Sequence, residues 1–299
     1  MNHNVRILIY SISIILLFVG CTQQKDKRAK VETKLEVVSG IAEVNGTRLY
    51  YEVAGKGDPI VLIHGNFGDC RHWDDQFEVF AKSHKILRYD VRGFGKSSLP
   101  VQGESYGHYD DLKELLGYLG ILKAHIAGWS MGCGIAVDFV LAYPEMSNSL
   151  IAVGPWVYAY SSPAAEELYT LFSEISSIVK ESGTRAAVDS LFNDFSIRNP
   201  KIADRLGEIA LDYSFWHFIN EDPVRSIDPP AMQQLERINL PNLIITAEYD
   251  IEPCREVADL LEQAILNAKK VDITDASHQM HMEKPVEFNR IVLDFLSKK

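Results

Sequence analysis

The stretch that decides the fold is His125-Ile126-Ala127-Gly128-Trp129-Ser130-Met131-Gly132. A short apolar run predicts a strand that leads into a Gly-x-Ser-x-Gly pentapeptide, and residues 133–143 predict a helix that stops at Pro144. At such a turn the serine is strained, and the two glycines let neighbouring backbone pass. The pentapeptide alone is weak, since two glycines and a serine recur by chance. Its position between strand and helix favours a nucleophilic serine over a glycine-rich turn that only opens a helix.

Outward from this turn, strand patterns alternate with amphipathic segments. Asn45-Gly46 lies between two alternating runs and predicts a β-hairpin, because both central turn residues need a positive φ. Further strands are predicted at 59–63, 83–89, 149–153, 242–246 and 270–273, and helices at 69–82, 110–119, 255–267 and 285–296. The alternation predicts an α/β fold with a mostly parallel central sheet and helices on both faces.

The pattern changes between residues 155 and 231, where aromatic side chains and helical spacing dominate and no buried strand is obvious. We predict a helical lid here, inserted between two strands and lying over their carboxyl ends, where such sheets bind ligands. The core of the domain is then formed by residues 37–154 and 232–299. Most aromatics of a helical insertion pack with one another, but Trp156 is predicted to contact substrate, together with Phe67 and Trp129 of the core.

A serine hydroxyl becomes a nucleophile only when a base takes its proton and an acid orients that base. Asp250 follows the strand predicted at 242–246, and His278 follows the strand predicted at 270–273. Both therefore stand at the carboxyl ends of strands, as Ser130 does. The order Ser, Asp, His along the chain is the one used by α/β-hydrolases. His281 is a second candidate for the base.

The chain resembles the α/β-hydrolase superfamily from about Val37 to its end, in the lid-containing, esterase-like branch with a serine nucleophile. Four blocks occur in the family's order: His64-Gly65-Asn66, the Asp-x-Arg-Gly-x-Gly-x-Ser block at 90–97, the elbow at 128–132, and Asp250 with His278. The resemblance implies a Ser130-His278-Asp250 triad. It favours His278 over His281 as the base, because the distance in sequence from His278 to Glu283 matches that of the family.

The resemblance implies two further features of the site. Some relatives carry the acid after the strand that precedes the lid, but this chain reads Val153-Gly154-Pro155 there, which leaves Asp250. The oxyanion hole is implied to be formed by the backbone N–H groups of Met131 and of Asn66, with Phe67 as an alternative. Each such donor lowers the barrier by about 3–4 kcal/mol.

Other residues of the blocks are expected to have structural roles. Asp90 and Arg92 brace the loop after their strand, and His64 orients the oxyanion loop. No cofactor is implied, and the cysteines and histidines lack the spacing of a metal site. Cys70, Cys133 and Cys254 are expected to be buried thiols, with a disulfide as the alternative in an exported protein.

These observations predict a hydrolase that cleaves a small or medium apolar carboxylic ester, lactone or thioester. Ser130 in place of an aspartate argues against a dehalogenase or epoxide hydrolase, and the oxyanion loop lacks the Gly-Pro-Gly extension of carbon–carbon bond hydrolases. The alternative is a membrane-tethered ligand sensor of the same fold with slow or no turnover. A formal charge of -11 argues against a general nucleic-acid-binding protein.

The N-terminal residues before the α/β pattern resemble a targeting segment. Residues 7–19 form a mostly apolar run after Arg6, with the length of a signal-peptide core, and 17–21 (Leu-Phe-Val-Gly-Cys) resembles a bacterial lipobox. We predict a signal peptide at 1–20, lipidation of Cys21 and a flexible tether at 21–36. The protein is then anchored in the bacterial cell envelope, at the outer membrane or the periplasmic face. An uncleaved anchor helix and an ordinary secretory signal are the alternatives.

Overall fold

The computed structural model describes residues 35–194 and 200–298. The predicted signal peptide, Cys21 and most of the predicted tether lie outside the described residues. Among the helices that are described, none combines the length and the apolar character needed to cross a membrane.

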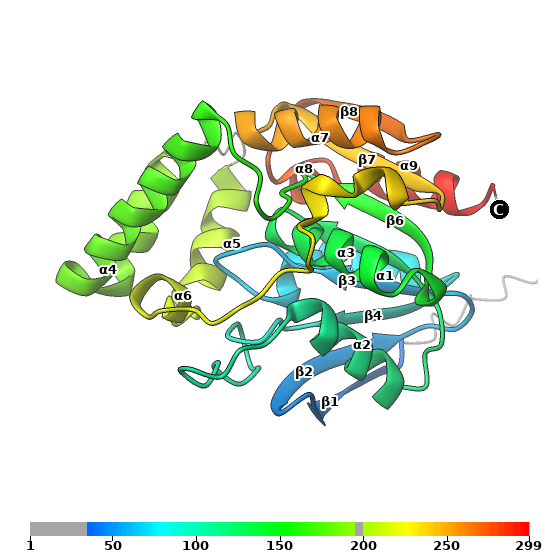
Figure 1. Cartoon of the computed structure of the whole chain (residues 1–299), viewed down its shortest axis with the longest axis horizontal. Coiled ribbons are helices and arrows are strands. Elements are labelled where there is room, and N and C mark those ends of the chain that lie inside the picture. The colour runs from blue at the N-terminus through cyan, green and yellow to red at the C-terminus, as the bar shows by residue number, and fades with distance from the viewer. Residues whose placement is uncertain (1–34, 195–199, 299) are drawn as a thin grey trace, which may run out of the picture. The chain divides into compact units, whose positions relative to one another are not determined.

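Eight strands form one sheet in the order β1-β2-β4-β3-β5-β6-β7-β8 (Figure 1). β1 (Val37–Val44) and β2 (Thr47–Ala54) form the predicted hairpin, and Asn45 and Gly46 have φ of 46° and 68°. β2 also pairs antiparallel with β4 (Lys85–Tyr89). All other pairings are parallel, and the strands are β3 (Pro59–Ile63), β5 (Ala124–Trp129), β6 (Ser147–Val153), β7 (Asn242–Tyr249) and β8 (Lys269–Ser277). The predicted α/β fold is confirmed.

Helices cover both faces of this sheet. One face carries α2 (His108–Tyr118), α3 (Met131–Ala142) and α7 (Glu252–Ala264), and the other carries α1 (Asp74–Ala81), α8 (Met280–Glu283) and α9 (Pro285–Leu296). Alternate residues of β3 serve the two layers: Val61 and Ile63 pack under α2 and α3, whereas Ile60 and Leu62 pack under α1 and α9. Because β3 is buried on both faces, its sequence is one continuous apolar run.

Between β6 and β7 lies the segment 155–231, which we call the insertion, and its described residues form three α-helices. They are α4 (Pro163–Asp194), which is interrupted at Gly183 with a φ of 83°, α5 (Pro200–Leu211) and α6 (Trp216–Ile219). In Figure 1 they stand at the left, beyond one end of the sheet. Short 3-10 turns occur at Cys70–Trp73, Pro144–Met146, Ala231–Gln233 and Leu235–Arg237.

Within the described residues, three ion pairs connect the insertion to the core. Arg205 on α5 pairs with Asp75 on α1 at 2.5 Å. Arg71 pairs with Asp212 at 2.8 Å. The third pair joins Arg225 to Asp110 of α2 at 2.6 Å. The insertion is therefore connected to the core at three points along its length.

Candidate active site

Ser130 stands between β5 and α3 in a conformation that its neighbours enforce. Its φ is 54° and its ψ is −120°, a region that residues other than glycine rarely adopt. A Cβ on Gly128 would lie 2.1 Å from the carbonyl oxygen of Gly132, and a Cβ on Gly132 would lie 2.4 Å from that of Ile63. Both glycines are thus required by close backbone approach, as the sequence pattern predicted.

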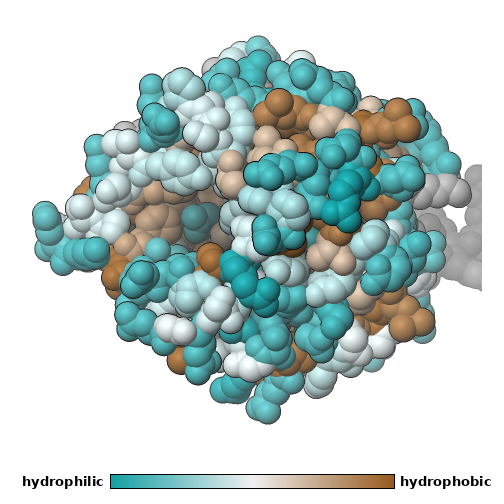
Figure 2. All heavy atoms as spheres, in the orientation of Figure 1, coloured by the Kyte–Doolittle hydropathy of each residue, from teal (hydrophilic) through white to brown (hydrophobic). Residues whose placement is uncertain are grey.

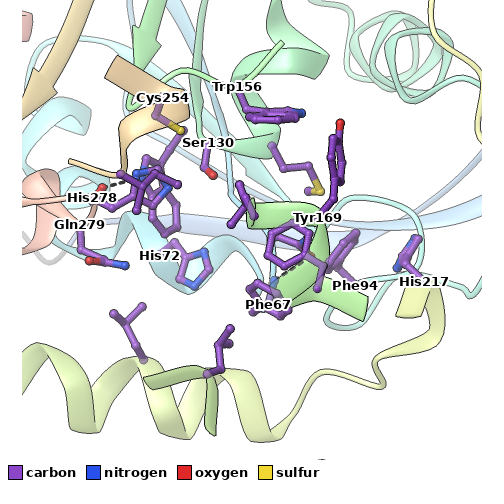
Figure 3. Close-up of a pocket in the computed structure, with 18 of the residues that line it drawn as sticks. Phe67, His72, Phe94, Ser130, Trp156, Tyr169, His217, Cys254, His278 and Gln279 are labelled. Carbon is purple, nitrogen blue, oxygen red and sulfur yellow. Dashed lines mark hydrogen bonds between the residues drawn. The ribbon is translucent and has the colours of Figure 1, made fainter. Parts of the chain in front are cut away.

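A buried hydrogen-bonded pair lies at the carboxyl ends of β7 and β8. His278 Nδ1 is 2.6 Å from Asp250 Oδ1, and Asp250 Oδ2 accepts a 3.1 Å hydrogen bond from Thr246 Oγ1. Because Asp250 fixes Nδ1 as the donor, Nε2 is the nitrogen of the His278 ring that can accept a proton. His278 and Ser130 line the same pocket (Figure 3). The structure therefore brings the three predicted triad residues to one place.

The loop that carries His278 is held from two directions. Ser277 donates to the Glu283 carboxylate through its backbone N–H (2.7 Å) and its hydroxyl (2.8 Å). Trp129 Nε1 donates to the carbonyl oxygen of His278 at 2.9 Å. The imidazole is thus fixed by its acid and its main chain by separate bonds, which limits its motion relative to β5.

Gly154, at the end of β6, lies directly against this pair. It has a φ of 45°, and a Cβ there would meet His278 Nδ1 at 3.0 Å and Asp250 Oδ2 at 3.2 Å. A carboxylate side chain at this position has no room beside the pair. The structure thereby gives a steric reason for the absence of an acid after β6.

His281 is placed elsewhere. It is fully buried, its Nε2 is 3.1 Å from the carbonyl oxygen of His72, and its ring packs on Trp73 and Trp129. Burial lowers the pKa of its imidazole well below the usual range. Its role is structural packing between α8 and the turn that precedes α1.

The loop after β3 supplies the candidate oxyanion donors. Asn66 and Met131 line the pocket with Ser130. The Phe67 N–H already donates to Asn66 Oδ1 at 2.9 Å, which favours the N–H of Asn66 over that of Phe67 as the second donor. His64 stabilises this loop: its Nε2 accepts from the Val91 N–H (3.0 Å), so its Nδ1 donates to the Gly65 carbonyl (2.7 Å). This neutral form agrees with the lowering of the pKa of His64 by burial.

The block at 90–97, directly after β4, braces the loops around the site. Both Asp90 oxygens accept backbone N–H groups, from Cys70 (2.9 Å) and from Lys96 (2.8 Å). Arg92 pairs with buried Asp111 of α2 at 2.6 Å. These are the structural roles that the sequence predicted for Asp90 and Arg92.

The pocket is a cavity of about 220 Å³ between the core and the insertion, and Figure 2 shows a hollow with apolar walls there. Phe67, Trp129 and Trp156, the three predicted substrate contacts, all line it. The Phe67 ring also packs against Phe172 and Phe218 of the insertion, with centroids 5.6 and 5.0 Å apart. The oxyanion loop and the insertion are therefore packed together through one side chain.

Sequence reasoning missed several polar residues that line the pocket, including His72, His217, Asp222 and Cys254. Burial lowers the pKa of His72 to about 3 and that of His217 to about 4, so both rings are neutral at pH 7. Burial raises the pKa of the Cys254 thiol well above its ordinary value. Cys70, Cys133 and Cys254 are buried and unpaired, as expected.

Comparison with known proteins identifies the class. Residues 60–291 match the model of the alpha/beta hydrolase family, so the chain belongs to that family. It is 27% identical to an Azorhizobium caulinodans protein that carries the provisional name carbamate hydrolase RutD. The match covers 83% of this chain and 94% of the relative. It is 25% identical to a 2-hydroxy-6-oxo-6-phenylhexa-2,4-dienoate hydrolase of Comamonas testosteroni, over 84% of this chain and 92% of the relative.

Solved structures show the same architecture. The enol-lactonase of Burkholderia xenovorans superposes with a TM-score of 0.72 at 24% identity and covers 86% of this chain and 100% of its own. The bromoperoxidase of Bacillus anthracis superposes with a TM-score of 0.72 at 27% identity, over 87% of this chain and 100% of its own. The fold is thus that of the alpha/beta hydrolase family.

Proposed function

We propose that the protein is a serine hydrolase that cleaves a small or medium apolar carboxylic ester, lactone or thioester through an acyl-enzyme. The observation that carries this proposal is that the strained Ser130 and His278, which is hydrogen-bonded to the buried Asp250, face one apolar pocket. Each residue supplies one part of the mechanism, and the backbone holds all three in place before substrate arrives.

In the proposed reaction Ser130 Oγ attacks the carbonyl carbon while His278 Nε2 takes the hydroxyl proton. Asp250 keeps the Nδ1–H in place and stabilises the imidazolium that forms. The N–H groups of Asn66 and Met131 bind the developing oxyanion. His278 then gives the proton to the leaving alcohol or thiol. Water attacks the acyl-enzyme in the same way, which releases the carboxylic acid and restores Ser130.

The size and the walls of the pocket support a small apolar acyl group. A cavity of about 220 Å³ is below the range of roughly 300–1,000 Å³ that is typical of drug-sized ligands. Aromatic side chains such as Phe67, Trp156 and Tyr169 form much of the wall. We therefore expect p-nitrophenyl acetate or butyrate to be hydrolysed faster than the octanoate.

The test is turnover of a panel of esters, lactones, thioesters and, because of the two named relatives, a carbamate and a phenylhexadienoate. Ser130→Ala, His278→Ala and Asp250→Asn are expected to lower kcat for the best ester by at least about a thousandfold. His281→Gln is the matched control, because this histidine does not contact Asp250. Ester turnover that Ser130→Ala leaves intact would refute the proposed mechanism, and rapid turnover by the parent protein would exclude the sensor alternative.

We also propose, from the sequence of the N-terminus, that Cys21 is lipidated and anchors the hydrolase in the bacterial cell envelope. The apolar run at 7–19 followed by Gly20-Cys21 supports this proposal. Labelling of cells with radioactive palmitate is expected to mark the processed protein that begins at Cys21 and to fail with Cys21→Ser. Equal labelling of both would contradict it.

A further inference from the structure

A third side chain of metal-binding type lies beside the proposed acid and base. Cys254 lies on the first turn of α7, four residues beyond Asp250. Its Sγ is within 4.8 Å of a carboxylate oxygen of Asp250 and of a ring nitrogen of His278, and all three residues are buried. Figure 3 shows the Cys254 sulfur on the same side of the pocket as the Ser130 hydroxyl and the His278 ring.

We propose that Cys254, His278 and Asp250 form an inhibitory site for a soft divalent cation, with Zn²⁺ as the fitting ion. A thiolate, an imidazole and a carboxylate are the three donor types that zinc takes in proteins, at about 2.0–2.3 Å from the metal. Donors around a tetrahedral ion at these distances lie roughly 3.4–3.7 Å from one another. Small side-chain rotations therefore suffice to gather three atoms that already lie within 4.8 Å.

Access to the site and its remaining coordination position come from the pocket. Cys254 and His278 both line it, so an ion arrives from solvent by the route proposed for substrate. A water molecule completes the tetrahedron from the pocket side. On binding, the Sγ–H bond breaks, the Sγ–metal bond forms and the proton passes to solvent.

Metal binding and the proposed catalysis exclude one another. If the ion takes His278 Nδ1, it replaces the 2.6 Å hydrogen bond to Asp250. If it takes Nε2, it occupies the lone pair that would accept the serine proton. In either case the base is lost. The inhibitory effect thus rests on the proposed function, whereas binding of the metal does not.

A second cluster in the described residues provides an internal contrast. Asp69, Cys70 and Asp90 are also buried with ligand atoms within 4.8 Å of one another. However, both Asp90 oxygens hold backbone N–H groups, Asp69 is paired with Arg71, and the cluster has no imidazole. Cys70 is also absent from the pocket wall. Cys70→Ala is therefore the matched control for Cys254→Ala.

The experiment is a Co²⁺ titration of the whole protein, read by the near-ultraviolet absorption of the cobalt–thiolate bond, with Zn²⁺ inhibition of ester hydrolysis in parallel. One equivalent of Co²⁺ is expected to produce the band in the parent, in Ser130→Ala and in Cys70→Ala. Cys254→Ala and Cys254→Ser are expected to lose it while retaining a cooperative thermal transition. Zn²⁺ is expected to inhibit the parent and Cys70→Ala at concentrations at least tenfold lower than either Cys254 variant, and Mg²⁺ to have no effect.

Two outcomes overturn the site: a cobalt–thiolate band that persists in folded Cys254→Ala, or no band in a parent protein that hydrolyses esters. A band in a protein that turns over no ester refutes the proposed function and leaves the metal site standing. The Ser130→Ala variant tests metal binding independently of catalysis, because it removes the proposed nucleophile and leaves all three metal ligands.

Discussion

Trp129 Nε1 donates a 2.9 Å hydrogen bond to the carbonyl oxygen of His278, which lies 149 residues further along the chain. The residue before the proposed nucleophile thereby holds the main chain of the proposed base. The Trp129 ring also lies 5.3 Å from the His278 ring, centroid to centroid. Sequence reasoning assigned Trp129 to substrate contact alone and did not foresee this bracing role. Its contact with substrate stays a prediction.

Trp129→Phe is expected to lower kcat by about tenfold and to change KM by less than about twofold. The aromatic ring remains, but a hydrogen bond that contributes about 1 kcal/mol is lost and the base becomes less well placed. Trp73→Phe is the control, because the buried Nε1 of Trp73 has no hydrogen-bond partner within the described part of the chain. Steady-state kinetics of both variants check this prediction. Equal losses of kcat would mean that ring size, and not the bond, matters.

Gly154→Ala is expected to reduce activity far more than stability. Its Cβ would press on His278 Nδ1 and Asp250 Oδ2, at 3.0 and 3.2 Å, and would separate the pair. Gly103 also has a positive φ (83°), but a Cβ there meets nothing within 4 Å. Gly103→Ala is therefore the control. Each of the two alanine substitutions costs about 1–2 kcal/mol of stability, because the backbone at each position has a positive φ. Similar shifts in Tm with a loss of kcat confined to Gly154→Ala are the predicted result, and full activity of Gly154→Ala would contradict the close packing at the pair.

The contribution of Asp138 on α3 to stability is expected to fall as the pH rises from about 4 to about 7. Burial raises the pKa of this carboxyl from its ordinary value of 3.8 to about 7. Between these values the Asp138 carboxyl therefore holds its proton in the folded state more often than in the unfolded state, and its contribution to folding stability falls by up to about 4 kcal/mol across the window. Asp138→Asn is expected to raise Tm at pH 8 and to leave it nearly unchanged at pH 4. Equal shifts at both pH values would show that ionisation of Asp138 is not the cause.

The ion pairs of the insertion are expected to control its opening more than the stability of the domain. Arg205 and Asp75 are each about 30% exposed, so their pair contributes about 1 kcal/mol or less. Arg205→Gln is expected to shift Tm little but to accelerate limited proteolysis within the insertion. Arg290→Gln is the control, because the Arg290–Asp294 pair lies within α9. Unchanged cleavage of the insertion would contradict this role for Arg205.

Local sequence patterns predicted most of the fold because each of them reports a local requirement, either the burial of a strand or helix face or a positive φ in a turn. Asn45-Gly46 predicted the hairpin, and apolar runs predicted the parallel strands. The helix predicted at 255–267 begins three residues earlier in the structure, at Glu252, and Pro253 lies in its first turn. Proline fits the first turn of a helix, where its missing N–H is not needed. The correct start places Cys254 one turn beyond Asp250, and this is the signal that could have found it.

The pocket wall that the insertion contributes could not be predicted from local sequence patterns. The sequence predicts Trp156 in the pocket but not His217 and Asp222, because the position of these two residues depends on how the insertion docks. That docking rests on contacts between residues distant in sequence, such as Arg205 with Asp75 and the Phe67 ring with Phe218. Helical spacing reports which face of a helix is apolar, but it does not report which neighbour covers that face.

The most direct test of the central claim is the site at which an aryl fluorophosphonate attaches to the intact protein, determined by peptide mass spectrometry. An activated serine Oγ forms a stable bond to phosphorus and releases fluoride, whereas an ordinary surface serine does not react. We predict one probe per chain, attached to Ser130, with no labelling of Ser130→Ala and at least about a hundredfold slower labelling of His278→Ala. Stoichiometric labelling that persists in Ser130→Ala would contradict the assignment of Ser130 as the nucleophile.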